Sequence, residues 1–271
     1  MKFFILFLLI LAMSQVETFA KEGNGKCLRE FDGYPLGPEK LEFIDRLQKI
    51  LDDNLSAKKL AFMKEIMPMA VNATEKVEVE RDFLAKLMAK KEFSEEEKSK
   101  LAALHVKYKT DDIKDKEGAL KELKMRINVI PLDLILTQAA LESGWGATPV
   151  AIKCNNLFGI HNSNGLSTCN TPSRKIAQFE SIQTSIEYHI LNLNRGVSYK
   201  AFREHRQKIL DKKETLTGVA LAPHLINYST RKTAYTNELV KVDNSNKLSS
   251  SVVEAIRLTE SYEWSPKDDG Q

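Results

Sequence analysis

Apolar residues recur at helical spacing through the first half of the chain. Between residues 39 and 90 they fall three or four positions apart, as at Phe43, Leu47 and Leu51. This spacing is typical of amphipathic helices. We therefore predict helix from about 39 to 90, and we expect Pro68 to bend or divide it, because proline removes a helical hydrogen bond.

A capping-box pattern begins the next predicted helix. Ser94 is followed three positions later by Glu97, the arrangement in which the two side chains satisfy each other's backbone N–H groups. Leu120, Leu123 and Ile127 then indicate a shorter helix. Together with the preceding helices, these segments predict an N-terminal helical region over about 39–127.

The next segment is apolar on nearly every face, from Leu132 to Leu141. That pattern predicts a helix buried in a core, with Pro131 at its start and Gly144 as a left-handed C-cap. Glu142 should then lie in the last turn, beside unpaired carbonyls and the negative end of the helix dipole. Desolvation and negative potential both favour the protonated carboxyl, so Glu142 is our leading candidate for a proton donor at neutral pH.

The segment after this helix has a different character. Residues 161–174 are polar and rich in turn-forming residues, which predicts a small β-hairpin or an irregular lobe within about 153–178. Ser181 is placed as the N-cap of a further amphipathic helix. Strand patterns are otherwise sparse, so the predicted fold class is mainly α.

Composition sets limits on the partners. The chain has 271 residues, 42% hydrophobic residues and a formal net charge of +3, enough apolar content for a sizeable core. Lys and Arg alternate with Asp and Glu through the first half, which is typical of solvated helix faces. We therefore expect no nucleic-acid partner.

The N-terminus has the layout of a secretory signal. A basic start at Lys2 precedes an apolar run over residues 3–13, too short for a comfortable bilayer span, and Ala20 closes a polar stretch. We predict a cleaved signal over 1–20, so that the membrane is contacted only through that segment, and an exported protein, periplasmic or secreted. We predict loose segments over 21–38 and 263–271.

Export permits disulfides. Cys154 and Cys169 bracket a loop rich in Asn, Ser and Gly, and we predict that they pair, leaving Cys27 unpaired. Three scattered cysteines without a histidine at ligand spacing do not suggest a metal site, and we expect no cofactor.

Hydrolysis of a glycosidic bond requires an acid to protonate the leaving oxygen and a second group that acts as base, nucleophile or charge stabiliser. Glu142 suits the first role, although a glutamate at this position could instead simply cap the helix or pair with a lysine. Sugars offer hydroxyls to bond and apolar faces to stack on. The candidates with suitable amide or aromatic side chains are Gln138, Trp145, Asn155, Asn156, Phe158, Tyr228 and Tyr235.

Several motifs together resemble a known family. The stretches Gln138–Gly146 (QAALESGWG) and Asn155–Ile160 (NNLFGI) are similar to those of bacterial peptidoglycan glucosaminidase domains with a lysozyme-like fold. Phe179-Glu180-Ser181, and Tyr228-Ser229-Thr230 with Tyr235, resemble later motifs of that family. The N-terminal helical region and Asn192-Leu193-Asn194 with Tyr199 are similar to its Bax-like branch.

The resemblance implies a lysozyme-like catalytic core over 128–262 and hydrolysis of the β-1,4 bond after N-acetylglucosamine in peptidoglycan. It implies that Glu142 is the catalytic acid and Tyr228 an important tyrosine. We expect the protein to act as a monomer.

One departure concerns the second catalytic group. Many relatives carry an acidic residue in the hairpin, whereas residues 161–178 contain no Asp or Glu. Glu180 or Glu187 could replace it, or the acetamido group of the substrate could assist with Tyr228 nearby. The alternatives to a glucosaminidase are a wall-binding or scaffolding protein that cuts poorly or not at all, a muramidase, and a lytic transglycosylase.

Overall fold

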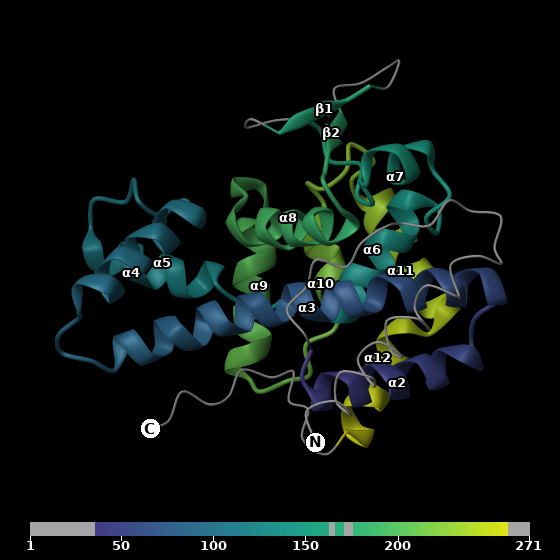
Figure 1. Cartoon of the computed structure of the whole chain (residues 1–271), viewed down its shortest axis with the longest axis horizontal. Helices are drawn as coiled ribbons and strands as arrows, with labels where there is room; N and C mark the ends of the chain where they lie inside the picture. The colour runs from purple at the N-terminus through teal and green to yellow at the C-terminus, as the bar shows by residue number, and fades with distance from the viewer. Residues whose placement is uncertain (1–35, 163–165, 171–175, 260–271) are drawn as a thin grey trace, which may run out of the picture. The chain divides into compact units, whose positions relative to one another are not determined.

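Helices make up most of the structure, and a single small sheet accompanies them. The computed structural model of the chain describes residues 36–162, 166–170 and 176–259. Within these ranges the only sheet is a two-stranded antiparallel hairpin (Figure 1). The prediction of a mainly α, lysozyme-like fold with a small hairpin lobe is confirmed. The predicted signal segment, Cys27 and the predicted tail lie outside the described residues.

The helical elements follow one another with short connections. In chain order they are α2 (Pro38–Asp52), α3 (Ala57–Met88), α4 (Glu95–Lys107), α5 (Lys116–Arg126), α6 (Leu132–Ser143), α7 (Pro149–Cys154), α8 (Ile182–Arg195), η1 (Val197–Tyr199), α9 (Lys200–Asp211), α10 (Gly218–Leu221), η2 (Ala222–Leu225), α11 (Thr233–Asn246) and α12 (Leu248–Leu258). The predicted capping box of Ser94 and Glu97 is present at the start of α4.

Helix α3 runs unbroken through Pro68, and the chain is divided instead at residues 53–56. Pro68 therefore does not divide the helix, so that part of the prediction is wrong, while a bend at Pro68 stays a prediction. Ile66 and Met67 beside it are fully buried. Burying apolar side chains contributes about 1.5–3 kcal/mol each, which offsets the roughly 3 kcal/mol that a proline costs inside a helix.

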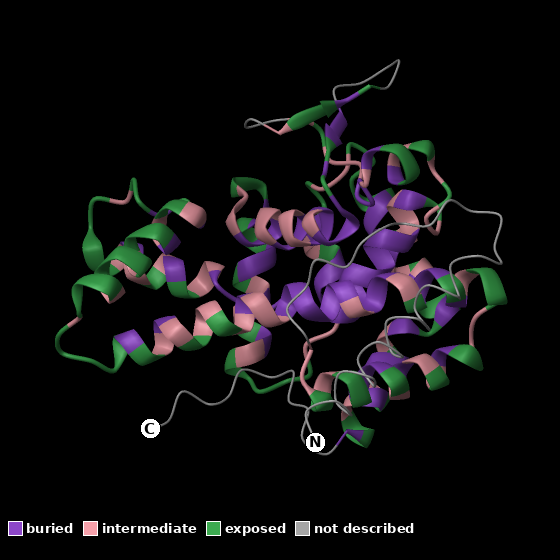
Figure 2. Ribbon diagram, viewed as in Figure 1, coloured by how far each residue is buried: buried purple, intermediate pink, exposed green. Residues whose placement is uncertain are grey.

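Helix α6 lies at the centre of the core and is buried on all sides, as its apolar pattern predicts (Figure 2). It packs against α3, α10, α11 and α12. Gly218 at the start of α10 allows the closest approach, because a Cβ added there would lie 2.9 Å from the Leu134 backbone. At the other end of α6, Gly144 adopts φ 58°, the predicted left-handed C-cap.

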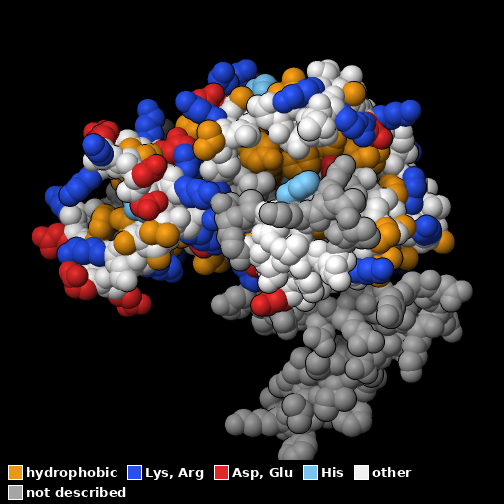
Figure 3. All heavy atoms as spheres, turned by 90° about the horizontal axis from the view of Figure 1, so that it is seen from above, with side chains coloured by type: hydrophobic (Ala, Val, Ile, Leu, Met, Phe, Trp, Pro, Cys, Tyr) orange, Lys and Arg blue, Asp and Glu red, His pale blue; other side chains and the backbone are white. Residues whose placement is uncertain are grey.

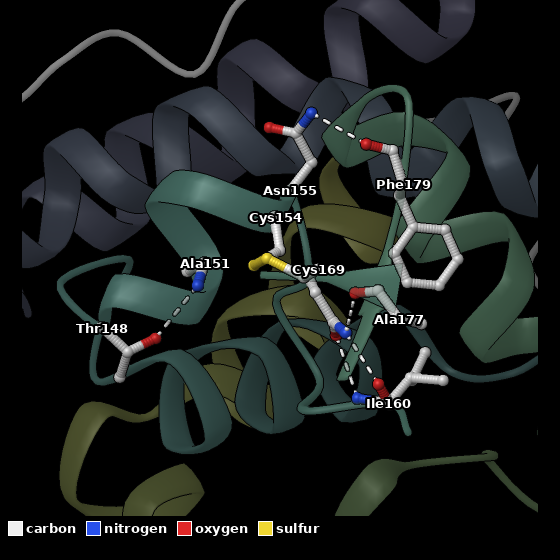
Figure 4. The surroundings of a disulfide bond; sticks show 9 residues. Thr148, Ala151, Cys154, Asn155, Ile160, Cys169, Ala177 and Phe179 are labelled. Carbon is white, nitrogen blue, oxygen red and sulfur yellow. Dashed lines mark hydrogen bonds between the residues drawn. A yellow bond between two sulfur atoms is a disulfide. The ribbon is translucent and has the colours of Figure 1, made fainter. Parts of the chain in front are cut away.

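The hairpin consists of β1 (Ser167–Cys169) and β2 (Ile176–Gln178), with Cys169 opposite Ile176. The predicted disulfide between Cys154 and Cys169 is present and joins the end of α7 to β1 (Figure 4). Together with Ile176, the two cysteines form a small apolar cluster. The disulfide therefore fixes the hairpin to the helix that follows α6.

A buried arginine links the N-terminal helices to the segments around α6. Arg206 on α9 donates hydrogen bonds to the carbonyls of Met125, Asn128 and Val129, and to Oδ1 of Asn194 on α8. Burial lowers its pKa to about 9, so the guanidinium remains charged at neutral pH. One side chain thus ties the end of α5 and the approach to α6 to α8 and α9.

The surface charges are interspersed. Figure 3 shows Lys and Arg side chains scattered among Asp and Glu on the visible face. Several of them form ion pairs on the helix surfaces, including Lys98 with Glu95 and Arg46 with Glu42. Among the described residues, none of the helices combines the length and the apolarity needed to cross a membrane.

Candidate active site

Glu142 lies in the last turn of α6, where the sequence predicts it, and its side chain is partly buried. Burial raises the pKa of its carboxyl above the usual range. A hydrogen bond from the Tyr235 hydroxyl and the charge of Arg231 oppose that rise, and the charge of Glu238 adds to it. Desolvation is thus the main reason for the raised pKa, and it favours the protonated acid.

Tyr235 connects Glu142 to the buried interior. Its hydroxyl accepts a hydrogen bond from Nε2 of Gln138, at 3.0 Å, and lies near enough to the Glu142 carboxyl for the two groups to shift each other's pKa. The Gln138 side chain is fully buried, one turn before Glu142 on the same helix. Gln138, predicted as a substrate-binding residue, thus contacts a tyrosine of α11. Its contact with substrate stays a prediction.

Two further tyrosines lie beside Tyr235. The Tyr228 ring stacks on the Tyr235 ring with centroids 5.2 Å apart, and the Tyr199 ring lies 6.3 Å from Tyr228. The Tyr228 hydroxyl donates to the Phe158 carbonyl at 3.3 Å. Burial raises the pKa of Tyr228 well above its usual value. Tyr228 therefore remains a neutral hydrogen-bond donor at neutral pH and does not supply a phenolate.

An ion pair borders this cluster. Arg231 precedes α11, and its guanidinium pairs with the carboxylate of Glu238, one turn after Tyr235. Both side chains are substantially exposed, and both influence the pKa of Glu142. Arg231 and Glu238 are thus the charged side chains that shift the pKa of Glu142.

Asn155 and Asn156 hold the backbone of the lobe. Nδ2 of Asn155 donates to the carbonyl of Phe179 at 3.1 Å (Figure 4) and to that of Glu180 at 3.0 Å. Asn156 is buried and bonds Ile160 through both its amide nitrogen and its oxygen. These amides fix the loop after α7 in place, and their contact with substrate stays a prediction.

The two predicted aromatic contacts differ in exposure. Trp145 is half-buried, with its ring edge-on to Phe62 and the Lys59 ammonium 4.7 Å from its centroid. Phe158 is buried and stacks on His189 with centroids 3.8 Å apart. Of the two rings, Trp145 is the one that solvent, and hence a sugar, can reach.

Glu180 and Glu187 are the two carboxylates predicted as the second catalytic group. Among the described residues, neither forms a hydrogen bond or ion pair with the tyrosine cluster. Glu187 forms an ion pair with Lys76 at 2.5 Å and accepts from Gln183. Glu180 is exposed, and among the described residues its carboxylate has no hydrogen bond or ion pair. The structure does not bring either carboxylate into contact with Glu142.

The predicted site residues did not include three residues that interact electrostatically with Glu142, namely Tyr199, Arg231 and Glu238. Arg231 and Tyr199 belonged to the Bax-like resemblance without a site role, and those motifs were the available signal. His189, which bonds Gln138, was also not among them. The helical spacing of Tyr235 and Glu238 could have placed Glu238 near the site. His189 had no local signal, because its partner Gln138 lies 51 positions earlier in the chain.

Across residues 36–162, 166–170 and 176–259, no group of three or more His, Cys, Asp or Glu side chains is arranged to hold a metal ion. Glu142 is a partly buried carboxyl group among neutral tyrosine hydroxyls, with one ion pair beside it.

Comparisons with known proteins agree with the resemblance found in the motifs. The family model described as glucosaminidase, mannosyl-glycoprotein endo-β-N-acetylglucosaminidase, matches residues 117–248. The chain is 29% identical to "Protein bax" of Escherichia coli (strain K12) over 192 residues, which are 70% of each chain. No solved structure matches the chain.

Proposed function

The chain carries a domain of the glucosaminidase family over residues 117–248, and from that premise we propose that it is an exported peptidoglycan hydrolase. The proposed bond is the β-1,4 linkage after N-acetylglucosamine, and the proposed general acid is Glu142. The family supports glycoside hydrolysis of peptidoglycan in general. The choice of bond, the export and the role of Glu142 are parts of the proposal.

The observation that carries the proposal is the environment of Glu142. Its carboxyl is partly buried at the end of a buried helix, and this burial raises its pKa. A carboxylic acid kept protonated near neutral pH can transfer its proton to the glycosidic oxygen as the bond to C1 breaks. Glu142 thereby becomes the carboxylate that could later accept a proton from the attacking water.

For the second catalytic group we favour the acetamido group of the substrate, oriented by Tyr228. Its carbonyl oxygen would attack C1 as the leaving oxygen departs, and water would later open the ring so formed. A neutral, hydrogen-bonding Tyr228 fits that orienting role. Glu180 remains the carboxylate alternative, although it is exposed and has no contact with the tyrosine cluster among the described residues.

Substrate contacts are proposed at the exposed parts of the site. The half-exposed Trp145 ring offers a face for a sugar, and Oδ1 of Asn155 is left to accept from a sugar hydroxyl. Gln138, Asn156, Phe158 and Tyr235 would act mainly by holding this surface in shape, because they are buried.

Export is supported by two features. The Cys154–Cys169 disulfide is of the kind that persists in oxidising compartments, and peptidoglycan lies outside the cytoplasm. We therefore propose a periplasmic or secreted monomer, with an N-terminal helical region over 39–127 and a catalytic core over 128–262.

The products of peptidoglycan digestion test this proposal. After digestion with the mature protein and borohydride reduction, a glucosaminidase leaves reduced glucosamine at the new chain ends. Reduced muramic acid would instead identify a muramidase, and anhydromuramic acid a lytic transglycosylase. Retention on insoluble peptidoglycan without release of fragments would contradict hydrolysis and favour the wall-binding alternative.

A further inference from the structure

A buried histidine contacts Gln138, which lies one turn before the candidate acid on α6. His189 on α8 is fully buried, and its ring is parallel to that of Phe158, with an angle of 2° between the planes. The edge of Tyr228 contacts the same ring, with centroids 5.7 Å apart. Nε2 of His189 lies 3.0 Å from Oε1 of Gln138, while Nδ1 has no hydrogen-bond partner among the described residues.

This arrangement determines the direction of each hydrogen bond toward Glu142. Oε1 of Gln138 can only accept, so the proton of His189 must be on Nε2. The Gln138 amide nitrogen then donates to the Tyr235 hydroxyl oxygen. The single proton of Tyr235 is consequently left free to point toward the Glu142 carboxyl, which lies one turn after Gln138 on α6.

The opposite orientation of the Gln138 amide is unfavourable. It would make Tyr235 donate to Gln138 and would leave Glu142 without that donor. It would also move the His189 proton to Nδ1, leaving a buried N–H group without an acceptor. Such a group costs about 1–3 kcal/mol, and buried N–H groups without partners are rarer than acceptors without partners.

We propose that His189 is a positioning residue for Glu142: acting through Gln138, it makes Tyr235 a hydrogen-bond donor to the Glu142 carboxylate. The inference rests on the proposed catalytic role of Glu142 and extends it to a residue 47 positions later in the chain. Burial also lowers the pKa of His189 to about 3, so the imidazole stays neutral and keeps one proton across the working pH range.

The other groups that face Glu142 come from different elements. Tyr199 belongs to η1, Tyr228 precedes α11, and Arg231 and Glu238 form the exposed ion pair. None of them contacts the ring nitrogens of His189 through an observed hydrogen bond. A substitution at His189 therefore tests the path through Gln138 and Tyr235 separately from these charges.

The test measures the pKa of the Glu142 carboxyl by ¹³C NMR in the full mature protein. Tyr235→Phe removes the donor, so the pKa of Glu142 should rise. His189→Leu removes the donor to Gln138 and should also raise the pKa of Glu142. His189→Gln, whose amide nitrogen reaches about as far as Nε2, should restore the wild-type value. In the double variant His189→Leu/Tyr235→Phe, the shift in the pKa of Glu142 should equal the shift caused by Tyr235→Phe alone.

The proposal is overturned if His189→Leu leaves the Glu142 pKa unchanged, if His189→Gln shifts it as much as His189→Leu does, or if the shifts of His189→Leu and Tyr235→Phe add. His189→Asn, which is polar but too short to reach Gln138, replaces the leucine variant if that variant does not fold. Because the titration needs no turnover, it decides the proposal even if Glu142→Gln digests peptidoglycan as fast as the wild type, an outcome that would refute the proposed function alone.

Activity gives a second readout. A general acid must be protonated, so activity should fall as pH rises through the Glu142 pKa. His189→Leu should move that alkaline limb to higher pH, whereas a purely structural loss would lower activity equally at every pH.

Discussion

The rings of Tyr228 and Tyr235 stack with an angle of 11° between their planes. Tyr235 bonds Gln138 on α6 and interacts with Glu142 one turn later, while Tyr228 bonds the Phe158 carbonyl in the loop after α7. The stack therefore joins the end of α6 to the base of the hairpin lobe. It brings two tyrosines with different roles to the same side of Glu142.

Removing the Tyr228 hydroxyl should impair catalysis without impairing the fold. Its hydrogen bond to Phe158 is long, and the ring contacts are kept in Tyr228→Phe. Loss of a donor that orients the reacting group typically costs about 100-fold to 1,000-fold in kcat. Rates of fragment release and thermal melting curves measure the two effects.

Tyr188→Phe is the matched control, because the Tyr188 ring packs on Phe179, away from Glu142. We expect wild-type rates for this variant. A Tyr228→Phe enzyme that is equally active would show that the hydroxyl has no part in the reaction.

The disulfide should stabilise the lobe measurably. It closes a loop with a sequence separation of 15, for which chain entropy gives about 3 kcal/mol. The double variant Cys154→Ser/Cys169→Ser should therefore unfold at lower denaturant concentration by an amount corresponding to about 3 kcal/mol. In the unreduced, denatured wild type, one thiol, that of Cys27, should be titrated. Three titratable thiols would contradict the pairing.

The buried carboxyl of Asp133 should make the protein less stable as pH rises. It accepts hydrogen bonds from the Gly218 N–H and the Ser249 hydroxyl, which also bonds Asp243. Burial, together with the charge of Asp243, raises the pKa of Asp133 to about 6. The folded protein thus binds this proton more tightly than the unfolded chain does.

This contribution to stability is complete below about pH 4 and is lost as pH rises through about 6. A shift of about two units corresponds to about 3 kcal/mol. Urea denaturation between pH 4 and 7.5 should show the free energy of unfolding falling as pH rises. In Asp133→Asn, the slope of this fall should be smaller. The exposed Asp45→Asn control should retain the wild-type slope. An unchanged slope in Asp133→Asn would contradict the assignment.

Local patterns in the sequence predicted the local features correctly. The buried α6, its C-cap at Gly144, the Ser94 capping box and the Cys154–Cys169 pair each depend on a short stretch with a clear physical signal. Pro68 shows the limit of such reasoning, because tertiary burial around it outweighs the local penalty.

The contacts between distant segments could not be predicted in the same way. Gln138 bonds residues 51 and 97 positions away, and nothing in their local spacing indicates that these side chains meet. Asn155 and Asn156 illustrate the related problem that an amide suited to a sugar is equally suited to a backbone carbonyl. The identity of a residue indicates what it can bond, while the fold determines which partner it finds.

The most direct test of the central claim is digestion of purified peptidoglycan with wild type and Glu142→Gln, using mass analysis of the released fragments. The amide keeps the shape of the side chain and removes the transferable proton. We expect fragment release to fall roughly 100-fold or more, with the fold intact by circular dichroism and with Glu254→Gln on the exposed face of α12 as active as wild type. Equal rates for the wild type and Glu142→Gln would contradict the role of Glu142 as the catalytic acid.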